Sequence, residues 1–171
     1  AIRARPGDET WIAAGLPHGT LQRAAVHTRA RTPSTRDEPL ARVRFVTNAE
    51  LSGAPLTREL REELDDAQRS RSPIAAAFVG GMPVSFCYAG SITERWWDVS
   101  IDTVEPFRRR GHAQAVAEFL IADYAMQGKA PVWCAVPSNP ASLKLARRLG
   151  FEQVGTLLIF TLIFTPPHAR R

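Results

Sequence analysis

An arginine-rich turn carries the most distinctive chemistry in this sequence. Residues Arg108 to Ala113 read Arg-Arg-Arg-Gly-His-Ala and lie between an apolar stretch and a segment with helical periodicity. A glycine at a strand-to-helix turn lets the backbone come close to a ligand, and the first N–H groups of the helix point at that ligand. The helix dipole adds positive potential at the same place. The turn therefore predicts a phosphate site that suits a pyrophosphate.

The spacing of this turn also resembles a family signature. Arg108-x-x-Gly111-x-Ala113 is similar to the R/Q-x-x-G-x-G/A motif of the GNAT superfamily of acyl-CoA-dependent N-acyltransferases. The resemblance covers roughly Ile74 to Phe164. It implies acetyl-CoA or another acyl-CoA as cosubstrate, an amine acceptor and direct transfer of the acyl group between them.

A second motif follows in the expected order. Asn139-x-x-Ser142-x-x-Leu145 and Leu149-Gly150-Phe151 resemble the second cofactor-side helix of the family and the strand after it. Two motifs in the right order and separation are more specific than either alone. Together they narrow the phosphate ligand from any mononucleotide to CoA.

The resemblance also assigns residues to the cofactor. A splayed strand would offer its backbone to the pantetheine arm, N–H groups of the turn would hold the pyrophosphate, and arginine side chains would add charge-assisted bonds. Alternatively, Gly111 makes only a tight turn, Asn139 is only a helix N-cap, and the arginines are solvated. The residues expected to bind the cofactor are Ile101, Asp102, Thr103, Arg108, Arg109, Arg110, Gly111, His112, Ala113, Gln114, Asn139 and Ser142.

Carboxylates in the strand before the turn are candidates for the general base. Alternation places Asp98, Ser100 and Asp102 on one face of the strand, where a carboxylate could accept an amine proton directly or through water. Asp102 is the first choice because it lies nearest the expected thioester, and Asp98 is the second. Glu94 and Glu105 are alternatives in loops. The aspartates could instead be exposed or bonded to nearby arginines.

One position departs from the family pattern. Many GNAT enzymes carry a tyrosine general acid four residues before the glycine of the second motif, and this chain has Ala146 there. Either another group or water protonates the leaving thiolate, or the protein is an acyl-CoA-binding or regulatory module with little or no turnover. The only tyrosines, Tyr88 and Tyr124, are both expected in the core.

The elements that must position these residues are readable from Ala41 onward. The resemblance implies a mixed α/β (α+β) fold, with a mainly antiparallel central sheet flanked by helices and splayed at the cofactor strand. Apolar periodicity, caps and glycine turns predict the following elements. They are strands over Ala41–Thr47, Ile74–Val79, Val84–Ala89, Trp96–Thr103, Pro131–Val136 and Leu157–Phe164, and helices from Thr57 to Ser70, from Ala113 to Gly128 and from Asn139 to Gly150.

Both ends of the chain are harder to interpret. Residues 1–40 contain four prolines and many charges and are expected to form a partly irregular extension before a domain at 41–171. Thr20 to Thr28 could form a short helix capped near Gly19. Leu157 to Phe164 is apolar on both faces, as in a strand buried between layers, although a sheet edge shared with another subunit is an alternative. A monomer or a homodimer is expected.

Composition sets further bounds on function. A chain of 171 residues with 44% apolar residues can form one domain with a real core, and no run approaches the roughly 18 apolar residues that cross a bilayer. Without a signal-peptide pattern, a cytoplasmic location is expected. The net charge is +5, and nearly all of the positively charged residues are arginines. A nucleic-acid-binding role through Arg108 to Arg110 is the weakest hypothesis, because the basic residues do not alternate with aromatics.

The remaining reactive side chains give weaker signals. Cys87 and Cys134 lack a C-x-x-C spacing and are interpreted as reduced core thiols, with a disulfide as the less favoured alternative. The four histidines are scattered, so no metal is expected. The tryptophans of the strands could line an acceptor pocket, but aromatic residues in strands are usually core. They are Trp96, Trp97 and Trp133.

Overall fold

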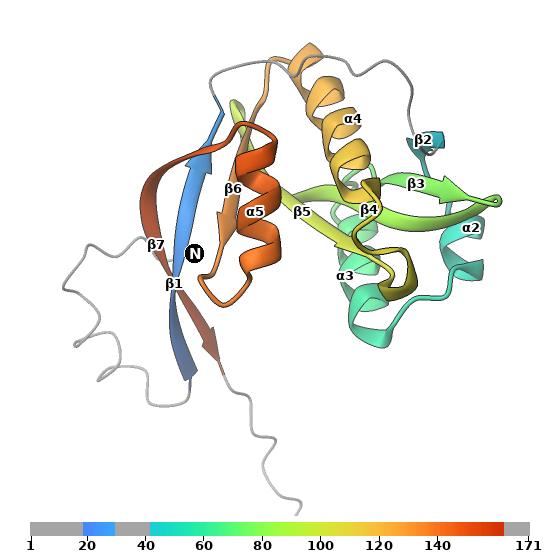
Figure 1. Ribbon diagram of the computed structural model, residues 1–171, viewed down its shortest axis with the longest axis horizontal. Coiled ribbons are helices and arrows are strands. Elements are labelled where there is room, and N and C mark those ends of the chain that lie inside the picture. The colour runs from blue at the N-terminus through green and yellow to red at the C-terminus, as the bar shows by residue number, and fades with distance from the viewer. Residues whose placement is uncertain (1–18, 30–41, 163–171) are drawn as a thin grey trace, which may run out of the picture.

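The computed structural model describes residues 19–29 and 42–162, which form a sheet with helices on both faces (Figure 1). The strands are β1 (Gly19–Thr28), β2 (Arg42–Phe45), β3 (Ala75–Val79), β4 (Met82–Ile92), β5 (Trp96–Thr103), β6 (Ala130–Ala135) and β7 (Glu152–Leu162). The helices are α2 (Asn48–Gly53), α3 (Arg58–Arg69), α4 (His112–Met126) and α5 (Pro140–Arg148), with a 3-10 turn η1 (Glu105–Phe107) before α4.

These strands form one sheet in the order β2-β3-β4-β5-β6-β1-β7. Neighbouring strands are antiparallel except for β5 and β6, which run parallel. The β3–β4 hairpin turns through Gly80 and Gly81, whose φ angles of 57° and 82° are those that paired glycines supply easily. The predicted mixed, mainly antiparallel sheet flanked by helices is confirmed.

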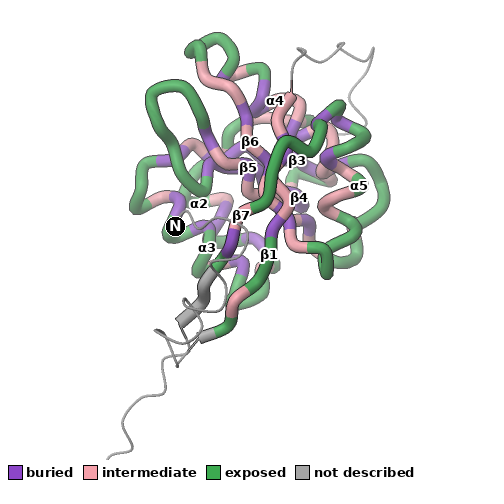
Figure 2. Tube along the Cα trace, turned by 90° about the vertical axis from the view of Figure 1, so that its left-hand side faces the viewer, coloured by how far each residue is buried: buried purple, intermediate pink, exposed green. Residues whose placement is uncertain are grey.

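Each face of the sheet packs against its own pair of helices. One hydrophobic cluster joins α4 and α5 to the sheet and contains Trp97, Leu120 and Trp133, and the other joins α2 and α3 and contains Leu64 and Phe86. Figure 2 shows buried residues gathered through β3, β4 and β5, whereas most of β7 is exposed. Successive residues of β5 therefore point alternately toward the two helix pairs.

The expected short helix over Thr20 to Thr28 is wrong, because this segment is strand β1. Its Leu-Gln-Arg-Ala-Ala run has good local helix propensity, but β1 is hydrogen-bonded to β6 on one edge and β7 on the other. Tertiary pairing therefore overrides the local preference. This part of the predicted extension therefore belongs to the sheet. Residues 1–18 and 30–41 lie outside the described residues, so the domain boundary at residue 41 stays a prediction.

Strand β7 lies at the edge of the sheet and is not buried between layers, so that expectation is also wrong. Leu158 is buried, but Ile159 is 39% exposed and Val154 is 62% exposed. These residues are exposed because β7 is the last strand of the sheet and pairs only with β1. Residues 163 and 164 of the predicted strand lie outside the described residues.

Candidate active site

The parallel strands β5 and β6 separate beyond Asp98. Their register runs only through Trp96↔Ala130, Trp97↔Pro131 and Asp98↔Val132. From Val99 to Thr103, β5 keeps β4 as an antiparallel neighbour but has no strand partner on its other side within the described residues. Backbone polar groups must be satisfied by some partner, so this stretch is open to an extended ligand. The splay predicted for this strand is confirmed.

A glycine turn stands at the end of the open stretch. Gly111 is the N-cap of α4, has a φ of 86°, and makes no side-chain cap hydrogen bond to the first turn of the helix. Arg109 also has a positive φ, 62°, which is uncommon for a residue with a Cβ. Such strained residues cluster where a backbone must point N–H groups at a ligand. The sequence-based interpretation of this turn as a phosphate cradle therefore fits the backbone.

The three arginines of the turn have different environments. The Nε of Arg108 donates to the backbone oxygen of Thr103 at 2.9 Å, and its Nη2 lies 3.6 Å from Asp102 Oδ1. Arg108 thus ties the turn back to the end of β5. Arg109 and Arg110 are exposed, and the Arg110 guanidinium lies 5.9 Å from the ring centre of Phe107. Their charge would be available to an anion bound at the turn.

His112 begins α4 beneath the cradle. It is buried, and its Nδ1 has no hydrogen-bond partner among the described residues. Burial, reinforced by the charge of Arg110, lowers the pKa of His112. The imidazole is therefore neutral at neutral pH.

The second motif lies at the same end of the parallel strands. Because β5 leads into α4 and β6 leads into α5, both helix N-termini follow the carboxyl ends of neighbouring strands. Asn139 caps α5 by accepting from Ser142 N–H at 3.1 Å, and Ser142 Oγ accepts from Trp133 Nε1 at 2.9 Å. The capping alternative raised for Asn139 thus occurs, and its amide nitrogen remains free to meet a ligand.

Asp98 and Asp102 share a face of β5 but differ in environment. Asp102 is 40% exposed, and its Oδ1 accepts from Thr103 N–H at 2.5 Å and faces Arg108. Asp98 is partly buried at the point where the strands separate, and its Oδ1 has no hydrogen-bond partner among the described residues. Burial raises the pKa of Asp98 to about 6, while a hydrogen bond from the Cys134 thiol lowers it.

The thiol of Cys134 belongs to this site. Cys134 is partly exposed on β6, whereas Cys87 is fully buried in the core, and both thiols are free. Burial, together with the neighbouring Asp98, raises the pKa of Cys134 to about 11. The thiol is therefore protonated at neutral pH and can donate to Asp98. Sequence reasoning missed this pair because it depends on how β5 and β6 are paired.

Strands β4 and β5 approach each other closely next to Asp98. The β4–β5 register shifts between Ala89 and Ile92, so β4 contains a bulge that falls within Gly90 and Ser91. A Cβ on Gly90 would lie 2.8 Å from Ser100 Oγ and 3.4 Å from Asp98 Oδ2. Glycine therefore lets the β4 backbone sit against both polar side chains.

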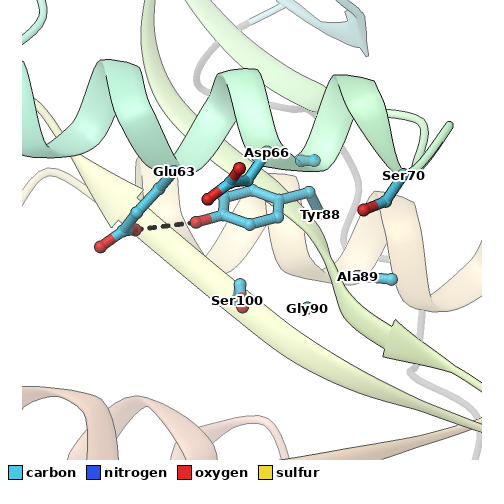
Figure 3. Close-up of a pocket in the computed structure, with 8 residues that line it drawn as sticks. Glu63, Asp66, Ser70, Tyr88, Ala89, Gly90 and Ser100 are labelled. Carbon is cyan, nitrogen blue, oxygen red and sulfur yellow. Dashed lines mark hydrogen bonds between the residues drawn. The ribbon is translucent and has the colours of Figure 1, made fainter. Parts of the chain in front are cut away.

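A cavity of about 320 Å³ opens on this face between α3, β4 and β5 (Figure 3). Tyr88 is buried, but its hydroxyl reaches the cavity and donates to Glu63 Oε2 at 2.8 Å. The expectation that Tyr88 is only a core residue is therefore incomplete. Among the residues that line the cavity are Glu63, Asp66, Ser70, Tyr88, Gly90 and Ser100.

Other aromatic and family-aligned positions are structural. Trp97 and Trp133 are almost completely buried in the cluster under α4 and α5, so the idea that they line an acceptor pocket is wrong. Trp96 is 45% exposed and shares the face of Asp98. Ala146 is completely buried in the same cluster and offers no acid, and Tyr124 packs against Trp97 at a ring distance of 4.6 Å.

Comparison with known families agrees with this geometry. A family model described as GNAT acetyltransferase matches residues 75–160, which span the β3–β4 hairpin, the splay, the glycine turn and both motif helices. The chain belongs to the GNAT acetyltransferase family. GNAT proteins act on acyl-CoA in general, so acyl transfer is the class of reaction that the fold supports. No curated protein shows significant similarity to this chain.

Solved structures share the GNAT fold at low sequence identity. A GCN5-related N-acetyltransferase-like protein from Streptococcus suis has a TM-score of 0.64 and 18% identity, with 90% of this chain and 67% of that chain covered. An acetyltransferase of the GNAT family from Colwellia psychrerythraea has a TM-score of 0.64 and 16% identity, over 90% of this chain and 61% of that one. An N-acetyltransferase from Staphylococcus aureus has a TM-score of 0.56 and 19% identity, with 74% of this chain and 100% of that chain covered.

Two further observations concern metal-ligating side chains and the lengths of the helices. No cluster of three or more metal-ligating side chains occurs in the described part of the chain. None of the helices in residues 19–29 and 42–162 is long and apolar enough to cross a membrane.

Proposed function

We propose that the protein transfers an acetyl group from acetyl-CoA to a primary amine of a small molecule or peptide by direct transfer. The observation that carries the proposal is the open edge of β5 leading into the Gly111 turn. A pantetheine arm along β5 and a pyrophosphate on the first turn of α4 would fit this arrangement. Backbone of Ile101, Asp102 and Thr103 and the N–H groups after Arg109 would hold them.

We propose Asp98, rather than Asp102, as the general base. Its carboxylate lies beside the splay, is not engaged by an arginine, and has a pKa of about 6, so it is ionised at neutral pH. The amide N–C bond forms as the thioester C–S bond breaks, and Asp98 accepts the proton lost by the amine. The protonated carboxyl group is then an acid available to the leaving thiolate, because an ordinary thiol has a pKa of about 8.5. This proton cycle replaces the tyrosine that is missing at Ala146.

A second candidate function is acyl-CoA binding with little or no turnover, and the buried Ala146 is the observation that favours it. Thiol release from acetyl-CoA across a panel of amines separates the two. Acetyl-CoA at saturation should raise the melting temperature in either case. Amine-dependent thiol release supports the transferase, whereas a thermal shift without any release supports the binding module. Absence of both effects would overturn both functions.

A further inference from the structure

The wall of the cavity between α3, β4 and β5 carries a hydrogen-bonded carboxylate that pairs with no cation in the part of the chain that the structure describes. Glu63 projects from α3, and the Tyr88 hydroxyl holds its Oε2 at 2.8 Å (Figure 3). Within the described residues, Glu63 forms no salt bridge, although its neighbours Glu62 and Asp66 on α3 pair with Arg58 and Arg69. A hydrogen bond that orients a carboxylate at a cavity wall prepares it for an incoming cation.

The charge of the cavity is opposite to that of the protein. The chain has 22 lysines and arginines and a net charge of +5, yet the residues that line the cavity include two carboxylates and no basic side chain. Asp98 does not line the cavity itself, but its Oδ2 would lie 3.4 Å from a Cβ on the lining residue Gly90. An acceptor bearing a carboxylate or phosphate would be repelled here, whereas a cation would be attracted.

We infer that the acceptor is a small aliphatic molecule with two amino groups, a diamine or polyamine. This inference rests on the proposed acetyltransferase function. One amine, in its neutral form, meets the thioester beside Asp98 and loses its proton to that carboxylate as the amide bond forms and CoA leaves as the thiol. The second, still protonated, sits between Glu63 and the ring of Tyr88, where an ammonium gains an ion pair and a cation–π contact.

The size of the cavity agrees with such an acceptor. A volume of about 320 Å³ lies at the small end of ligand pockets, which span roughly 300–1,000 Å³, and equals the space of about ten water molecules. A linear diamine fits within it. Selectivity would come from the second charge, because a site built around an ion pair rejects an uncharged analogue more strongly than a purely apolar site does.

The test compares two acceptors of equal length, diaminopentane and aminopentanol, in which a neutral hydroxyl replaces the second ammonium. We expect kcat/KM for diaminopentane to exceed that for aminopentanol by about tenfold or more, the range of a charged hydrogen bond. Glu63→Gln should raise KM for diaminopentane about tenfold and change KM for aminopentanol less than about twofold. Glu62→Gln, on the same helix but outside the cavity, should change neither.

A binding measurement separates this inference from the function on which it rests. In calorimetry, the CoA-bound protein should bind diaminopentane more tightly than aminopentanol. This difference in affinity should disappear in Glu63→Gln. Turnover or binding that is equal for the two acceptors would overturn the diamine inference and leave the acetyltransferase in place. Acetyl-CoA binding without turnover of any amine would overturn both. An equal loss for both acceptors in Glu63→Gln would assign Glu63 a structural role only.

Discussion

At the scale of single residues, the proposed base is a carboxylate whose environment differs from that of its neighbour. Asp98 and Asp102 are two positions apart on the same face of β5, but Arg108 faces Asp102 while Cys134 donates to Asp98. Alternation along the strand is enough to predict the shared face. The sequence analysis ranked Asp102 first for its position near the expected thioester. The features that favour Asp98, a thiol from β6 and burial beside Gly90, depend on how the strands pair and are not visible in the sequence.

Replacement of Asp98 tests its role as base. Asp98→Asn should lower kcat/KM by about 100-fold or more, since an amide cannot accept the proton. For an aliphatic amine, log kcat/KM of the wild type should rise with a slope of two below pH 6 and one above it, because both the amine and Asp98, with its pKa of about 6, must lose a proton. The variant should show a slope of one throughout. The measurement is kcat/KM of both proteins as a function of pH, below and above pH 6.

The fold should survive this substitution. A pKa raised by burial means that the native state disfavours the charged carboxylate, so folding stability declines as pH rises from the unfolded pKa toward 6. Asp98→Asn should therefore unfold at or above the wild-type temperature at neutral pH. Asp65→Asn on the exposed side of α3 is the control and should keep full activity. Full activity of Asp98→Asn would instead remove Asp98 from the mechanism.

The thiol of Cys134 should set the position of that pH break. Its hydrogen bond lowers the pKa of Asp98, so Cys134→Ala should move the break in slope to higher pH, whereas Cys134→Ser, which keeps a donor, should leave it close to the wild-type value. Activity well above the break should be similar in all three proteins. A break that does not move in Cys134→Ala would show that the thiol has no influence on the base.

At the scale of elements, the cofactor side depends on how α4 begins. Gly111 and the glycine after α4, Gly128, both have positive φ angles, 86° and 73°, but only Gly111 lies at the predicted phosphate cradle. The tight turn itself could be predicted, because a glycine between an apolar strand and a periodic helix favours a positive φ angle.

The two glycines form a matched pair of variants. Gly111→Ala and Gly128→Ala should each lower the unfolding free energy by about 1–2 kcal/mol, the cost of a left-handed conformation for a residue with a Cβ. Only Gly111→Ala should also weaken CoA binding, by about tenfold, because strain there displaces the N–H groups of the first turn. Calorimetry with CoA and thermal unfolding measure the two effects. Equal CoA affinity in both variants would contradict the cradle.

Element prediction succeeded where local signals were strong. The helix predicted from Thr57 to Ser70 is α3, which Thr57 caps and which buries Leu60, Leu64 and Ala67. Helix α2 was missed, although Thr47 and Glu50 form a capping box that can be read from Thr-x-x-Glu. The helix has only six residues, too few for an apolar periodicity to appear.

At the scale of the whole molecule, the first described strand joins the edge strand β7 to the rest of the sheet. β1 lies between β6 and β7, so the edge strand β7 is attached to the sheet only through β1. No local signal in residues 19–28 indicates partners that far away in the chain, and this is why a helix was expected there. The extent of the sheet was therefore the least predictable part of the fold.

A buried charge in β1 tests this arrangement. Ala24 is completely buried, so Ala24→Asp should lower the unfolding free energy by about 3 kcal/mol or more, the cost of an unpaired charge in the interior. Gln22→Asp, at an exposed position of the same strand, should stay within about 0.5 kcal/mol of the wild type. Denaturant unfolding measures both. A tolerated Ala24→Asp would place β1 outside the cooperative unit.

The position of β1 also sets the timing of folding during synthesis. His27 bonds to Trp133, 106 residues later in the chain. At roughly 5–20 residues per second, the ribosome delivers the β6 partner on the order of ten seconds after β1 has been made. Until then β1 has a bare edge on the side that β6 will occupy, and β7 emerges later still. Mispairing of β1 in this interval is therefore a route to aggregation for variants of this strand that is separate from weakness of the finished sheet.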